Sequence, residues 1–136
     1  QDARLQLTGA LAVTLREQGD LEGALAAHAE AIALAEALYG PRHPSLATEL
    51  NNAAAARIQQ GDLEGSEQLL RRALEIREAS FGPTHRSVLE GQINLAILEL
   101  QRGHVDAAAA RLDVAAQAVS QHFLVKQQLV LFYINF

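Results

Sequence analysis

Residues 61–65 read Gly-Asp-Leu-Glu-Gly, and residues 19–23 carry the same five amino acids. The step of 42 residues between these copies also carries Tyr39-Gly40-Pro41 onto Phe81-Gly82-Pro83. One further step takes Gly61 to Gly103 and Asn52 to Asn94. Recurrence of several landmarks at one spacing indicates internal repeats. We therefore predict three units, at residues 1–42, 43–84 and 85–126, followed by residues 127–136 as the degenerate start of a fourth repeat or a C-terminal tail.

Each unit is predicted to contain two helices. In the second unit, Pro44 suits the first turn of a helix, where its missing N–H is not needed. Gly61 then favours a helix end, and Asp62 can cap the next helix, which Gly82-Pro83 terminates. Because the connections are short, the paired helices should run antiparallel. The predicted helices span residues 4–18, 21–39, 45–60, 63–81, 87–102 and 105–122, and no β-sheet is expected.

Small residues occupy the same places in all three units, which indicates close helix packing. Alanine or serine recurs seven residues before Gly19, Gly61 and Gly103, and also five and twelve residues after each of them. Such positions let helix axes approach to about 8 Å. The nine residues are Ala12, Ala54, Ala96, Ala24, Ser66, Ala108, Ala31, Ala73 and Ala115.

Composition argues against several classes of protein. The 136 residues carry a net charge of −5 and no cysteine, so a basic nucleic-acid-binding surface and thiolate metal sites are not expected. No apolar stretch approaches the roughly 18 residues of a membrane span. We expect a cytoplasmic protein with no nucleic acid or membrane as partner. The chain begins with Gln1 and contains no methionine, which suggests a fragment or a processed piece.

No motif of catalysis or of cofactor binding is present. The sequence contains neither a phosphate-binding loop nor a dinucleotide fingerprint, and no histidine pair has zinc-motif spacing. His43 and His85 recur at equivalent turns, so we interpret them as structural residues beside helix starts. His28 is expected to be half-buried in a helix. We predict no enzyme activity, no cofactor and no metal.

A glycine between two helices, with small residues at these offsets, resembles the tetratricopeptide repeat. The 42-residue spacing, the motif Gly-Pro-x-His-Pro at residues 40–44 and Leu-Asn-Asn at residues 50–52 are similar to the kinesin-light-chain subtype. The resemblance implies an all-α, right-handed α-solenoid of antiparallel helix-turn-helix repeats. Departures occur at Arg86, which replaces the second proline, and at residues 124–126, where Leu-Val-Lys replaces Gly-Pro-x.

The asparagines at mid-helix are the candidate binding residues. In the family that the chain resembles, first helices line a concave groove, and asparagines here hydrogen-bond the ligand backbone. Asn52 and Asn94 are the stronger candidates, because Asn51 is matched by Ile93 in the third unit. The alternative is that these amides bridge neighbouring helices. The 3.6-residue period places further residues on the same face, namely Val13, Thr48, Ala55, Gln59, Glu90, Ile97 and Gln101.

Two functions remain open at this stage. The favoured prediction is a non-catalytic scaffold that binds a protein or peptide segment in the concave groove. The alternative is a structural module of a larger protein that self-associates through its apolar C-terminal segment, Leu124–Phe136, since exposed apolar segments favour association.

Overall fold

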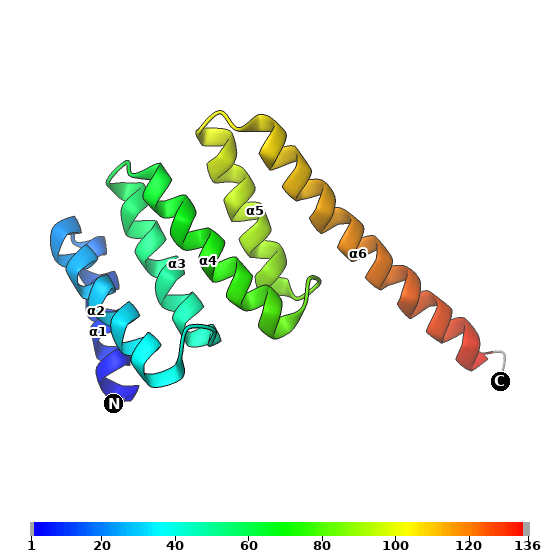
Figure 1. Ribbon diagram of the computed structural model, residues 1–136, viewed down its shortest axis with the longest axis horizontal. Coiled ribbons are helices and arrows are strands. Elements are labelled where there is room, and N and C mark those ends of the chain that lie inside the picture. The colour runs from blue at the N-terminus through cyan, green and yellow to red at the C-terminus, as the bar shows by residue number, and fades with distance from the viewer. Residues whose placement is uncertain (1, 135–136) are drawn as a thin grey trace. The chain divides into compact units, whose positions relative to one another are not determined.

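The computed structural model describes residues 2–134, and at positions 2, 132 and 133 it describes the backbone alone. The chain divides into two units, residues 1–80 and 81–136. In the first unit, α1 (Asp2–Glu17), α2 (Leu21–Tyr39), α3 (Pro44–Gln59) and α4 (Leu63–Phe81) follow one another as antiparallel hairpins (Figure 1). The second unit contains α5 (Arg86–Gln101) and α6 (Val105–Ile134). Every regular element in residues 2–134 is a helix, which confirms the all-α class.

The glycine turns form as the sequence predicts. Gly61 ends α3 with φ of 83°, in the left-handed region that side chains with a Cβ rarely adopt. The Asp62 side chain then accepts a hydrogen bond from Gly65 N at 2.9 Å. At the same place in the first repeat, Asp20 accepts from Gly23 N at 3.0 Å. Each carboxylate satisfies a backbone donor that a helix start leaves unpaired.

His43 and His85 have the structural role expected of them. Nδ1 of His43 accepts from Ser45 N at 3.1 Å, which caps α3, and the same distance joins His85 to Ser87 N at the start of α5. Each imidazole also stacks on the aromatic residue that ends the preceding helix. The ring centroids lie 4.4 Å apart for Tyr39 and His43 and 4.5 Å apart for Phe81 and His85.

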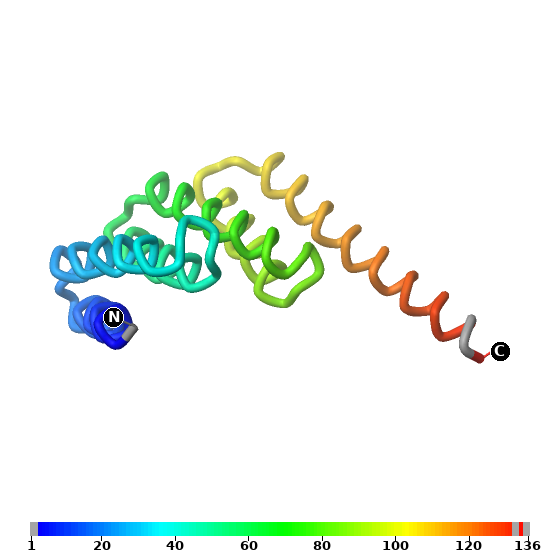
Figure 2. The backbone as a smooth tube through the Cα atoms, turned by 60° about the horizontal axis from the view of Figure 1, so that its bottom comes forward, coloured from blue at the N-terminus to red at the C-terminus, as the bar shows by residue number. Residues whose placement is uncertain are grey.

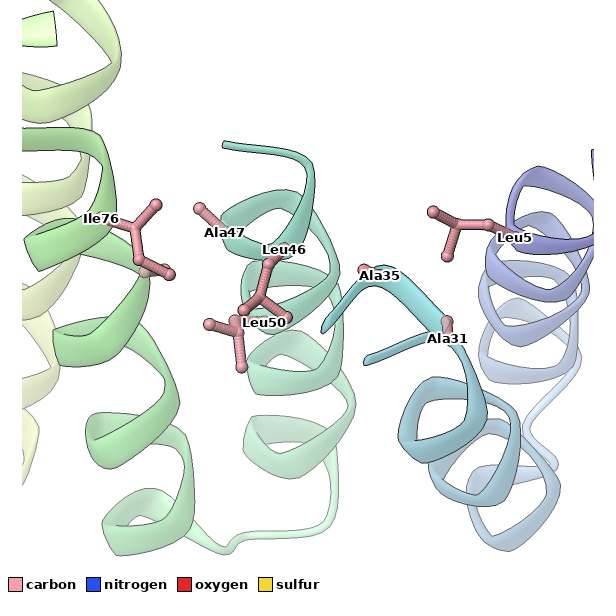
Figure 3. Packing of buried hydrophobic residues seen from close by; sticks show 8 residues of the cluster. Leu5, Ala31, Ala35, Leu46, Ala47, Leu50 and Ile76 are labelled. Atoms are coloured by element: carbon pink, nitrogen blue, oxygen red, sulfur yellow. The ribbon is translucent and has the colours of Figure 1, made fainter. Parts of the chain in front are cut away.

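The core of residues 1–80 is built from alanine and leucine on all four helices. Figure 3 shows Leu46 and Leu50 of α3 beside Ala31 and Ala35 of α2, with Leu5 of α1 and Ile76 of α4 to either side. Of the nine predicted packing positions, eight are buried and Ala115 is half-buried. The predicted pattern of close helix contacts is thus confirmed, with α6 departing from it.

One helix is longer than predicted. The first five helices begin and end within two residues of the predicted bounds, but α6 continues to Ile134 where an end at residue 122 was expected. Figure 2 shows α6 as a single unbroken helix. The cause lies at Leu124 and Val125, which occupy the places of Gly82 and Pro83. Neither residue interrupts helical hydrogen bonding as Gly-Pro does.

Candidate functional site

The candidate residues of α3 lie opposite its buried face. Leu46, Leu50 and Ala54 face the core with no exposed surface. We name the opposite residues the α3 row: Thr48 and Gln59 are exposed, and Asn51, Asn52 and Ala55 are half-buried. The α3 row therefore forms one helix face that is open to a ligand.

The two neighbouring asparagines differ in their contacts. The Asn51 amide, with its oxygen turned toward α4, accepts a hydrogen bond from Nη2 of Arg77 at 2.9 Å. Asn52 has no hydrogen-bond partner within the described part of the chain. Asn51 thus bridges two helices of one repeat, as the alternative interpretation expects, whereas the Asn52 donors and acceptor are free to bind another molecule.

The candidate residues of α5 form an equivalent row in the second unit. Glu90, Asn94, Ile97 and Gln101, here named the α5 row, are all exposed. Glu90 pairs with Arg86 one turn away, at 2.9 Å between Nε and Oε1. The Asn94 amide has no hydrogen-bond partner among residues 2–134. Asn94 therefore repeats the situation of Asn52, 42 positions along the chain.

Next to the α3 row lies a buried carboxyl group that sequence reasoning missed. Glu49 of α3 is buried, and its Oε2 has no hydrogen-bond partner among the described residues. It packs against Gly9 of α1, where an added Cβ would lie 3.1 Å from Oε1. Burial raises the pKa of Glu49 above its usual value. Its repeat equivalents, Leu7 and Gly91, gave no signal of a polar site.

Val13, the candidate of α1, is half-buried.

His28 is more deeply buried than expected. Its side chain is 1% exposed, and neither ring nitrogen has a hydrogen-bond partner within residues 2–134. Burial lowers the pKa of His28, and the positive charge of Arg16 lowers it further. The expectation of a half-buried residue was therefore wrong. Leu70, at the equivalent position of the second repeat, is itself buried and was the signal that this place belongs to the core.

The second unit contains a buried polar network that joins α5 to α6. Arg111 Nε donates to Glu99 Oε1 at 2.6 Å, and Arg111 Nη1 donates to Gln92 Oε1 at 2.9 Å. Glu99 has no exposed surface. Leu50 and Leu69 stand in the first unit where Gln92 and Arg111 stand here. The network holds α5 and α6 together, and none of its residues belongs to the α3 row or the α5 row.

Among the described residues, no group of three His, Asp or Glu side chains is placed to hold a metal ion. In the same part of the chain, no helix combines the length and the apolar character needed to cross a membrane.

Comparisons with known proteins agree with this architecture. Solved structures with the same fold include BtubC (BKLC) from P. vanneervenii, with a TM-score of 0.76 and 21% identity over 86% of this chain and 46% of that one. A second is a Podosopora anserina kinesin light chain with nearly identical TPR-like repeats, with a TM-score of 0.73 and 21% identity over 90% of this chain and 58% of that one. The chain thus spans about half the length of these structures. These similarities show that the chain shares the helical repeat fold of those proteins.

The family is given by a match to the sequence itself. No curated protein matches the chain. The model of the tetratricopeptide repeat family matches residues 3–78 and again residues 47–120, which together include Gly19, Gly61 and Gly103. The chain belongs to the tetratricopeptide repeat family.

Proposed function

We propose that this chain is a non-catalytic interaction module that binds a peptide segment of a protein through the exposed faces of its first helices. The observation that carries the proposal is the pair Asn52 and Asn94. Both amides lie on the face opposite the buried one, and neither has a hydrogen-bond partner in the described part of the chain. The proposal keeps the division into repeats at residues 1–42, 43–84 and 85–126.

An amide side chain suits recognition of a peptide backbone. It offers two donors and one acceptor, so it can pair with a backbone C=O and N–H whatever side chains the peptide carries. The helix beneath is held by a packed alanine and leucine core, so little ordering is needed when the ligand binds. The repeat thereby presents one amide at the same place on α3 and α5.

The charges of the two rows favour a peptide over an anionic ligand. Among the row residues Glu90 alone is ionisable, and it is paired with Arg86. A carboxylate or phosphate site would need a lysine or arginine in the row. The net charge of −5 also disfavours nucleic acid as a partner.

Selection from a random peptide library against the immobilised chain tests this proposal. Peptides enriched on the unaltered protein should bind Asn52→Ala and Asn94→Ala more weakly, and Gln68→Ala as strongly as the unaltered protein. Gln68 is a matched control because it is an exposed amide on a second helix, α4. Failure to enrich any peptide, or equal weakening by Gln68→Ala, would argue against the rows as the binding face.

A second candidate function is assembly through the C-terminal segment Leu124–Phe136. The supporting observation is that large apolar side chains of α6 are exposed from Val119 to Leu131 and again at Ile134. Of that segment, residues 135 and 136 and the side chains of Phe132 and Tyr133 lie outside the described residues. Light scattering after size-exclusion chromatography tests it, because a monomer at high concentration would exclude self-association.

A further inference from the structure

The distal part of α6, residues 119–134, carries a face that the rest of its unit leaves uncovered. α6 has 30 residues and its partner helix α5 has 16, so α6 extends beyond α5 by about 20 Å. Val119, Val130 and Ile134 are 45%, 56% and 72% exposed. From Val114 to Ile134 the only charged side chain is Lys126. An apolar face of this length favours a partner.

The repeat shows what the end of α6 corresponds to. A shift of 84 positions carries Leu46, Ala47 and Leu50 onto Val130, Leu131 and Ile134. In α3 all three residues are fully buried in the core cluster. Apolar residues thus stand at each of these core positions, although their side chains on α6 are exposed. The last turns of α6 have the core face of a first helix.

The same shift shows what should receive that face. It carries Ala31 and Ala35 of α2 onto Ala115 and Val119 of α6. Ala31 and Ala35 lie in the same core cluster as Leu46 and Leu50 (Figure 3). α6 therefore contains both sides of a contact that, in the first unit, joins two helices across the turn at residues 40–43.

A straight helix cannot make this contact with itself. Val119 and Val130 are separated by about 16 Å along one unbroken helix. The turn that would fold the segment back is missing, because Leu124 and Val125 replace Gly-Pro. When a turn is replaced by a continuous helix, the segment at residues 130–134 can no longer reach Ala115 and Val119 of its own chain. Both parts are then free to pair with a second copy, which is how domain-swapped dimers form.

We propose that two copies of this chain pair through antiparallel α6 helices, each placing Val130, Leu131 and Ile134 on Ala115 and Val119 of the other copy. The pairing transfers the α2–α3 contact, in which residues 46 and 50 share one core cluster with residues 31 and 35, to the two α6 helices. In the register that we assign, residue 130 lies opposite residue 119 and residue 134 lies opposite residue 115. Its two-fold axis passes between Leu124 and Val125, both 55% exposed. The proposal deepens the second candidate function and is independent of peptide binding by the α3 and α5 rows.

Self-complementarity is the reason for choosing a second copy as the occupant. Each α6 carries both residues 130–134 and the residues on which they pack, Ala115 and Val119. Two copies can therefore cover each other's apolar residues, and the assembly closes as a dimer. The absence of acidic residues from 114–134 means that no pair of like carboxylates opposes the contact.

Cross-linking of engineered cysteines tests the register, since the chain has no cysteine of its own. Val119→Cys/Val130→Cys should give a covalent dimer with a short bifunctional maleimide. Gln117→Cys/Gln128→Cys has the same spacing on exposed positions and should react several-fold more slowly. Equal cross-linking of the two pairs would overturn the proposed register while leaving assembly intact.

Restoring the missing turn tests the swap itself. Light scattering should give a dimer for the unaltered chain and a monomer for Leu124→Gly/Val125→Pro, in which residues 128–134 can fold back on their own α6. A monomeric unaltered chain would refute both the swap and the second candidate function. A dimeric double variant would refute the swap alone. Circular dichroism checks that the variant is folded, and if it is not, the cysteine pairs decide the question.

Discussion

At the scale of single residues, the departures from the repeat identify the polar groups that the core accommodates poorly. His28, Ser66 and Glu49 all have buried polar atoms without a hydrogen-bond partner in the described part of the chain. For His28 and Ser66 the other two repeats carry an apolar residue at the same place. A buried polar atom left unpaired costs about 1–3 kcal/mol of stability, so restoring the apolar residue should stabilise the fold.

His28→Leu should raise the free energy of unfolding by about 1–3 kcal/mol at pH 7.5. The gain should grow as the pH falls. Because burial and Arg16 lower the pKa of His28 in the folded state, the unfolded chain binds more protons below a pH of about 6.5, and the unaltered protein loses stability there. The leucine variant lacks this loss. Urea unfolding of the two proteins at pH 7.5 and pH 5.5 measures the stabilisation and its dependence on pH. If the variant is stabilised equally at the two pH values, the pKa of His28 is not lowered in the folded state.

Ser66→Ala should raise the free energy of unfolding by about 1–2 kcal/mol, since it removes a buried hydroxyl without changing the packing. Ala24 and Ala108 show that alanine fits this position in the other repeats. Ser80→Ala, at an exposed position of the same helix, is the control and should gain only about 0.5 kcal/mol of helix propensity. Matching gains for the two variants in thermal unfolding would contradict a buried, unsatisfied Ser66.

At the scale of helices, the local signals predicted most bounds because each end depends on a few residues. Gly61 with Asp62 and His43 with Pro44 form the caps that their types favour, so five helices end where expected. The end of α6 could not be predicted in the same way. The sequence shows that Leu124 and Val125 replace Gly-Pro. That replacement alone did not predict that residues 126–134 continue the helix, because another helix-breaking feature could have ended it before Ile134.

The α5–α6 pair offers a test of buried polar packing. Arg111→Leu should destabilise the protein by about 3–5 kcal/mol, because it leaves Glu99 as an uncompensated buried charge. The triple variant Gln92→Leu/Glu99→Leu/Arg111→Leu should recover most of that loss, since buried ion pairs are often replaceable by apolar residues. Denaturant unfolding of both variants measures this. If the triple variant is as unstable as the single one, the hydrogen bonds and the ion pair of the network stabilise the fold by more than the burial of these polar groups destabilises it.

At the scale of the whole molecule, the sequence predicted the family better than the contacts around the candidate residues. The glycine spacing and the small residues were enough for the all-α repeat, because both depend on local chemistry that recurs. The sequence ranked Asn52 above Asn51, because Ile93 stands at the place of Asn51 in the third unit. It did not predict the pairing of Asn51 with Arg77, which depends on how α4 packs. The burial of Glu49 against Gly9 likewise required the packing of α1 on α3.

Paired measurements on Asn52→Ala test peptide binding most directly. A peptide selected on the unaltered protein should lose about 1–3 kcal/mol of affinity, which is roughly a 5- to 150-fold rise in Kd. The melting temperature should not fall, because the Asn52 amide has no partner among residues 2–134 and alanine slightly favours a helix. A variant that binds the peptide at full strength would contradict the proposed binding face, whether or not its melting temperature changes.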